Sequence, residues 1–77
     1  MNLEIVSPEA IIYSGKAKSV TLPGLSGSFT ILERHAPLIS LLKKGELLYR
    51  MNEKVEIVEV NEGFVEVINN KVSVCIE

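Results

Sequence analysis

Apolar and polar residues alternate along much of this chain, as they do in a β-strand with one buried face. The alternation is clearest in VSVCIE, residues 72–77, where Val, Val and Ile share one face and Ser, Cys and Glu share the other. The segment VEIVEV, residues 55–60, also alternates, but its apolar residues Ile57 and Val58 are adjacent. That change of phase predicts a β-bulge or a strand buried in part on both faces.

Turn-forming residues divide the chain into short segments of this kind. MNEK joins ELLYR to VEIVEV, and NNK joins FVEVI to VSVCI. Two apolar runs joined by so short a polar link are typical of a β-hairpin. The pattern therefore predicts two hairpins, over residues 46–60 and 64–76.

The leucines of residues 38–42 have a spacing that would also suit a helical turn. Pro37, however, disfavours a helical conformation at Ala36, and Gly45 ends the run early. We therefore expect an extended segment there as well. Many short strands and no long helical pattern predict an all-β fold, a small β-sandwich or barrel.

The size of the chain limits it to one domain, residues 1–77. A domain this small buries only about 60% of the surface that its unfolded chain exposes, so contact with a partner subunit would add stability. Cys75 is the only cysteine, which excludes an internal disulfide and fits a reducing, intracellular setting. One His and one Cys cannot form the usual four-ligand zinc site.

The charges exclude some classes of partner. The formal net charge is −2, and the closest groupings of basic residues, Lys16 with Lys18 and Lys43 with Lys44, are too small to neutralise many phosphates. We therefore do not expect nucleic-acid binding. The longest largely apolar run, residues 36–42, is far shorter than the roughly 20 residues that cross a bilayer. The first ten residues lack the features of a signal peptide, so association with a membrane would occur only through partners.

No catalytic constellation is evident in the sequence. His35 and Cys75 are the candidates for a nucleophilic pair, but there is no Asp to orient the imidazole, and Cys75 reads as a small residue packed in a strand. For His35 we expect a structural role, as an imidazole that is hydrogen-bonded at a turn or an interface. PGLSG, residues 23–27, lacks the Lys-Ser/Thr of a phosphate-binding loop. We expect neither an enzyme nor a bound cofactor or metal.

A carrier domain is the competing hypothesis. Lipoyl and biotinyl domains are all-β and carry a modified lysine at a hairpin tip, and Lys71 follows the predicted turn residues Asn69 and Asn70. The residues that flank Lys71 are Asn70 and Val72, which match neither the methionines of biotinyl domains nor the Asp-Lys-Ala of lipoyl domains. An intact mass would reveal an attached prosthetic group.

Four segments, taken in order, are similar to one family. They are LEIVSPEAIIYSG (3–15), VTLPGLSGSFTIL (20–32), HAPLISLLKKGEL (35–47) and NEGFVEVINNKVSVCIE (61–77). Together they resemble the N-terminal domain of the epsilon subunit of F-type ATP synthases, over essentially the whole chain. The resemblance implies a flattened sandwich of about ten strands in two sheets, with no bond chemistry of its own.

In that family the domain lies at the foot of the central rotor stalk, between the gamma subunit and the membrane-embedded c-ring. The resemblance therefore implies a rotor subunit that couples ion-driven rotation to ATP synthesis. It would be peripheral to the cytoplasmic face of the bacterial inner membrane, with the stromal face of a plastid thylakoid as the alternative. The family also has a C-terminal helical hairpin that inhibits hydrolysis and in some members helps to bind ATP. The sequence here ends at Glu77, so we expect coupling without self-inhibition.

The resemblance also implies two contact segments. The segment expected to meet the c-ring comprises Gly24, Leu25, Ser26, Gly27, Ser28, Phe29 and Thr30. The segment expected to dock on gamma comprises His35, Ala36, Pro37, Leu38, Leu41 and Leu42. Three positions depart from the family: Ser28 stands where Glu is common, Thr30 where Gly is common, and Glu33-Arg34 where a Pro-x pair is usual.

Overall fold

Every regular element of the computed structural model, which describes residues 1–77, is a β-strand, as the alternating pattern predicts. The prediction of an all-β sandwich is confirmed, with nine strands in place of about ten. They are β1 (Asn2–Val6), β2 (Ile11–Lys16), β3 (Ser19–Gly24), β4 (Gly27–Leu32), β5 (Leu38–Leu42), β6 (Gly45–Met51), β7 (Lys54–Val60), β8 (Gly63–Ile68) and β9 (Lys71–Ile76).

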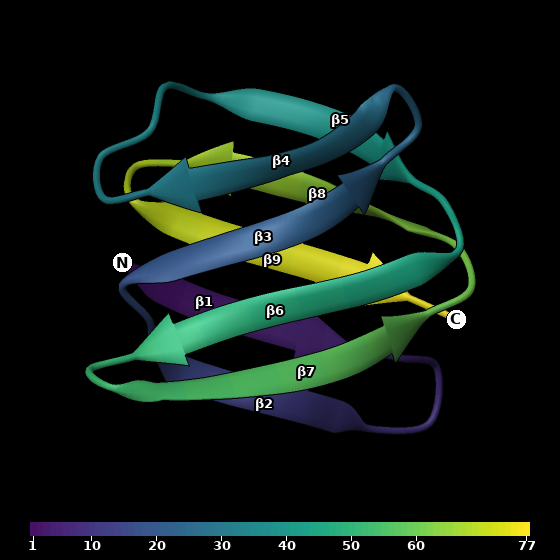
Figure 1. Cartoon of the computed structure of the whole chain (residues 1–77), viewed down its shortest axis with the longest axis horizontal. Coiled ribbons are helices and arrows are strands. Elements are labelled where there is room, and N and C mark those ends of the chain that lie inside the picture. The colour runs from purple at the N-terminus through teal and green to yellow at the C-terminus, as the bar shows by residue number, and fades with distance from the viewer.

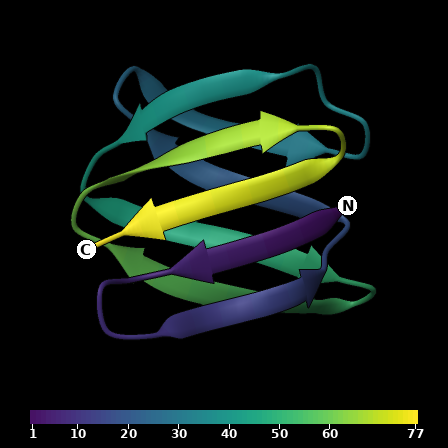
Figure 2. The ribbon, with the colours of Figure 1, turned by 180° about the vertical axis from the view of Figure 1, so that it is seen from behind.

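The strands form two layers. The first sheet has the order β2-β1-β9-β8-β5 and the second has the order β4-β3-β6-β7. A single residue pair, Gly24 with Leu42, joins β3 to β5 and so links the two sheets. The second sheet is in front in Figure 1, and the first sheet is in front in Figure 2, which views the molecule from the opposite side. The pair β1–β9 is parallel and all the others are antiparallel.

The connections lie at the two ends of the strands. Met1 and the β2–β3, β4–β5, β6–β7 and β8–β9 connections share one end, which we call the Met1 end (Figure 1). Glu77 and the remaining four connections share the opposite end, the Glu77 end. Antiparallel connections place segments far apart in the sequence at the same end of the sandwich.

Both predicted hairpins are present, as β6–β7 and β8–β9. Asn69 and Asn70 have positive φ angles of 49° and 60°, which a two-residue hairpin turn of type I′ requires and which Asn tolerates better than most residues. Residues 38–42 are extended, as expected, and form β5.

The bulge predicted in residues 55–60 is absent. The β6–β7 register runs unbroken from Gly45–Val60 to Met51–Lys54. Val55 and Ile57 instead point outward from this edge strand and remain 49% and 58% exposed, so the change of phase adds apolar surface without altering the register or burying both faces. The register shift lies elsewhere, between Ile5 and Val6 of β1.

The core lies between the sheets and is entirely apolar. Sixteen buried hydrophobic residues form it, and no polar or charged side chain is buried. Away from the β3–β5 link, Tyr13 of β2 packs on Tyr49 of β6 with ring centroids 4.5 Å apart. This aromatic pair holds the two sheets together on that side.

Candidate docking surfaces

The side chains that could take part in catalysis or metal binding are not assembled into an active site. His35 is exposed at the Met1 end, where its Nδ1 lies 2.7 Å from the carbonyl oxygen of Ala36. Cys75 is half-buried near the Glu77 end, beside Phe64 and Val6. The two candidates for a nucleophilic pair are therefore separated along the strand direction. No group of three or more His, Cys, Asp or Glu side chains is placed to hold a metal ion.

Lys71 does not occupy a hairpin tip. The tip is formed by Asn69 and Asn70, and Lys71 is the first residue of β9, paired with Ile68 on one side and Asn2 on the other. Lys71 is exposed, but it lies beside the tip and within β9, so the prediction that it occupies a hairpin tip is wrong.

The segment predicted to dock on gamma divides between surface and core. His35, Ala36 and Pro37 are exposed in the β4–β5 connection at the Met1 end. Leu38 is half-buried against the core and Leu42 is only 3% exposed, so both side chains pack into the core and not on the surface.

Within β5 the exposed apolar side chains are Leu41, at 60%, and Ile39, at 73%. Ile39 is not among the residues predicted to dock on gamma. The period of two in a strand places Ile39 on the same face as Leu41, and that signal could have identified it.

An apolar row crosses the outer face of the first sheet near the Glu77 end. Its members are neighbours in register on five successive strands, namely Ile11, Val6, Cys75, Phe64 and Leu41. We call this row the apolar stripe. Ile11, Leu41 and Phe64 are 65%, 60% and 46% exposed. A contiguous exposed apolar surface of this kind is typical of an interaction site.

The segment predicted to meet the c-ring lies at the same end as the stripe. Leu25 and Ser26 form the two-residue β3–β4 turn, and Gly27 has a φ of +132°, which only glycine adopts readily. The exposed members of the segment are Leu25, Ser26, Ser28 and Thr30, and the first three lie nearest the Glu77 end. Leu25 N–H donates to the carbonyl oxygen of Leu41 over 3.2 Å, which fixes the turn beside the stripe.

The remaining members of this segment are structural. Gly24 is buried, and an added Cβ there would collide with the Phe29 ring and the Gly27 carbonyl. Phe29 packs against the core. Thr30 lies within β4, and its hydroxyl is 2.8 Å from that of Thr21. A cleft of about 380 Å³ between Leu25, Leu41 and Phe64 connects the turn to the stripe. The structure thus joins the ring segment to Leu41 and separates both from residues 35–37.

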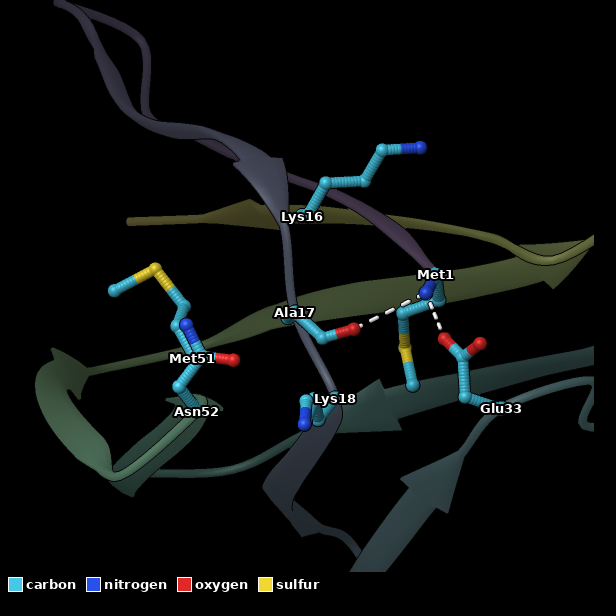
Figure 3. A pocket seen from close by; sticks show the side chains of 7 residues that line it. All are labelled: Met1, Lys16, Ala17, Lys18, Glu33, Met51 and Asn52. Atoms are coloured by element: carbon cyan, nitrogen blue, oxygen red, sulfur yellow. Dashed lines mark hydrogen bonds and ion pairs between the residues drawn. The ribbon is translucent and has the colours of Figure 1, made fainter.

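The Met1 end holds a second feature that no sequence motif indicated. A cleft of about 490 Å³ is lined by Met1, Lys16, Ala17, Lys18, Glu33, Met51 and Asn52 (Figure 3). The α-ammonium of Met1 donates to the carbonyl oxygen of Ala17 over 3.1 Å and pairs with the Glu33 carboxylate. Burial lowers the pKa of this α-amino group, and the nearby Lys16 ammonium lowers the pKa further.

The comparisons with known proteins agree with this architecture. A family described as the ATP synthase delta/epsilon chain β-sandwich domain matches residues 1–77. The chain is 43% identical over 74 residues to the ATP synthase epsilon chain of Leptospira borgpetersenii, covering 96% of this chain and 58% of that one. It is 45% identical over 78 residues to the epsilon chain of Sulfurimonas denitrificans, covering 100% and 60%. The chain thus spans about three-fifths of the length of these relatives.

Two solved structures share the fold. One is the mitochondrial ATP synthase of Euglena gracilis, described as OSCP/F1/c-ring in rotational state 1. It has a chain with a TM-score of 0.90 at 18% identity, covering 96% of this chain and 48% of that one. The other is the central stalk and c-ring of the Tetrahymena thermophila mitochondrial enzyme, with a TM-score of 0.84 at 17% identity, covering 97% and 61%. No helix in the structure has the length and apolar character needed to cross a membrane.

Proposed function

This chain belongs to the family of ATP synthase delta/epsilon β-sandwich domains, and from that premise we propose that it is a non-catalytic part of the rotor. In this proposal the chain packs on the gamma subunit and on the c-ring, and couples ion-driven rotation of the ring to ATP synthesis. It is peripheral, at the cytoplasmic face of a bacterial inner membrane, and reaches the membrane only through those partners.

The observation that carries the proposal is the apolar stripe. A side chain such as Leu or Phe contributes about 1.5–3 kcal/mol when a partner buries it completely. The stripe presents three such side chains at roughly half exposure, Ile11, Leu41 and Phe64, and Ile39 extends the surface along β5. Full burial of this row would supply several kcal/mol, enough to anchor an interface whose remaining contacts are weak. We assign the stripe, with Ile39, to gamma.

The ring contact follows from the position of the β3–β4 turn. Leu25, Ser26 and Ser28 lie at the Glu77 end, next to the stripe. The outer face of the first sheet is therefore free to contact gamma while the Glu77 end contacts the ring. Ser28 offers a hydroxyl where the family commonly has a carboxylate. A hydroxyl can donate and accept hydrogen bonds, so a polar contact remains available without a charge.

A matched pair of substitutions tests the gamma assignment. Leu41→Asp places a charge in the stripe, and Ile57→Asp places the same charge on the outer face of the second sheet, at a residue of nearly equal exposure, 58% against 60%. We expect Leu41→Asp to abolish retention on immobilised gamma while circular dichroism shows a folded domain. Ile57→Asp should be retained like the parent protein. Equal retention of both variants would contradict the assignment.

Crosslinking tests the ring assignment. In a Cys75→Ser background, a cysteine at Ser28 should crosslink to a cysteine in the polar loop of the c-subunit. A cysteine at Asn52, which lies at the Met1 end, is the control and should not crosslink. Crosslinking from Asn52 in place of Ser28 would mean that the domain is inverted relative to this proposal.

A further inference from the structure

Basic and acidic residues are segregated along the strand direction. The Met1 end carries two of the ten acidic residues, Glu33 and Glu53, and six of the eight basic ones, namely Lys16, Lys18, Arg34, Arg50, Lys54 and Lys71. The Glu77 end carries two basic residues and five acidic ones, namely Lys43, Lys44, Glu9, Glu46, Glu59, Glu62 and Glu77. A protein with a net charge of −2 therefore has one strongly positive end.

Most of the positive charges at the Met1 end are not neutralised within the chain. The structure contains two ion pairs, which join the α-ammonium of Met1 to Glu33 and Lys54 to Glu56. Lys16, Lys18, Arg34, Arg50 and Lys71 have no carboxylate within ion-pair distance. Of the two acidic residues at this end, Glu33 is already paired with the α-ammonium of Met1, so only Glu53 remains to neutralise the other charges. The nearest acidic residues on the outer face of the first sheet, Glu4 and Glu66, lie one row further toward the middle of the strands.

Regular backbone positions these side chains. Lys16 and Lys71 flank Asn2 on the outer face of the first sheet, on three successive strands. Lys18 N–H donates to the carbonyl oxygen of Arg50 over 2.7 Å, which ties the β2–β3 connection to β6. Figure 3 shows the Lys16 side chain extending away from the cleft.

Arg34 is held in the same way. Its φ is 62°, and its N–H donates to Asn70 Oδ1 over 2.8 Å, which joins the β4–β5 connection to the β8–β9 turn. A second cleft, of about 480 Å³, lies here between Arg34, His35 and the two turn residues Asn69 and Asn70. The basic residues thus surround the two clefts at the Met1 end, and backbone hydrogen bonds hold the segments that carry them.

We propose that the Met1 end is an interaction surface for an acidic polypeptide segment, distinct from the surfaces assigned to gamma and the ring. Its charges are distributed over both sheets of a molecule about 19–25 Å across, so they match an extended row of carboxylates better than a single anion. A small phosphate site needs donors that converge, and the N–H of Arg34 is already donated to Asn70. Single-stranded nucleic acid usually stacks its bases on exposed aromatic side chains of the protein. Tyr13 and Tyr49 pack on each other and do not offer such a surface.

The choice of a protein over an anionic membrane rests on the proposed function. If the β3–β4 turn meets the c-ring, the Met1 end is at the opposite end of the sandwich and faces away from the bilayer. An acidic segment of a neighbouring soluble subunit, or of a regulatory protein, is then the chemistry that this surface fits.

Neutralisation of charges at each end tests the proposal on the whole 77-residue chain. The probe is a short poly-L-glutamate peptide, titrated at low and at physiological salt. Lys16→Gln, Lys18→Gln, Arg34→Gln and Lys71→Gln together should weaken binding about tenfold or more, because each exposed ion pair contributes a modest amount. The control carries Lys43→Gln and Lys44→Gln, at the Glu77 end, and should bind within about twofold of the parent. Parent binding should weaken as salt rises.

Equal affinity of the two variants, or no parent binding, would overturn the proposal. So would tighter binding of the parent to pyrophosphate, or to phosphatidylcholine vesicles containing phosphatidylglycerol, than to the peptide. Retention on gamma and on the c-ring is measured with the same proteins and should be unchanged in the four-site variant. Failure of the parent to bind gamma or the ring would count against the proposed function, whereas the peptide result tests the Met1 end independently.

Discussion

Replacing Leu41 and Leu42 by alanine, one at a time, separates docking from folding at two adjacent residues. Leu42 is 3% exposed and belongs to the core, whereas Leu41 is 60% exposed and belongs to the stripe. Truncating a buried leucine removes its transfer free energy and leaves a cavity, which costs about 2–5 kcal/mol. Truncating an exposed one removes mainly the cross-strand contact with Phe64, which costs below about 1 kcal/mol.

These costs are large relative to the stability of so small a domain. At about 0.05–0.15 kcal/mol per residue, 77 residues give a free energy of unfolding of about 4–12 kcal/mol. Leu42→Ala would therefore remove a substantial fraction of the stability, and Leu41→Ala would remove little. For gamma binding the order reverses, because Leu41→Ala deletes contact surface and should weaken affinity about tenfold.

Urea unfolding followed by circular dichroism measures the first quantity, and titration with gamma under folding conditions measures the second. The reasoning would be refuted if Leu41→Ala lowered the free energy of unfolding as much as Leu42→Ala. It would also be refuted if folded Leu42→Ala lost more affinity for gamma than Leu41→Ala. Either result would mean that β5 presents the opposite face to the core.

Three further predictions concern stability. Burial raises the pKa of the Tyr49 hydroxyl above its usual 10.0, so stability should be intact below about pH 10 and fall as pH rises through the folded value; denaturation at stepped alkaline pH should show this fall, and Tyr49→Phe should lack it. Gly63→Ala should cost about 1–3 kcal/mol, since its Cβ would strike the backbone of Cys75; an unchanged thermal midpoint would contradict this. Asn70→Ala should cost about 1–2 kcal/mol, because alanine disfavours positive φ and the acceptor for the Arg34 N–H is lost; a cost below about 0.5 kcal/mol in urea unfolding would argue against it.

The secondary structure was predictable because local pattern determines it. Alternation and turn residues identified both hairpins, and Pro37 correctly favoured a strand over a helical turn at residues 38–42. The bulge predicted at Ile57 and Val58 is absent, because two adjacent apolar residues do not require burial of both. On an edge strand, an apolar residue can face solvent without changing the register.

The surfaces could be predicted only in part because they depend on pairing between distant segments. The stripe exists because β1 pairs in parallel with β9 and β8 pairs with β5, which brings Ile11 and Leu41 into one row. No local pattern specifies those pairings. The basic end was hidden for the same reason, since its residues are dispersed from Lys16 to Lys71 and converge only when successive connections return to the same end.

The central claim is that the outer face of the first sheet is covered in the rotor. Hydroxyl-radical footprinting of the chain, free and assembled with gamma and the c-ring, tests it most directly. We predict that oxidation of Ile39, Leu41 and Phe64 falls several-fold on assembly, while Val55 and Ile57, on the outer face of the second sheet, react as they do in the free chain. Protection of Val55 and Ile57 with no change in the stripe would contradict the account.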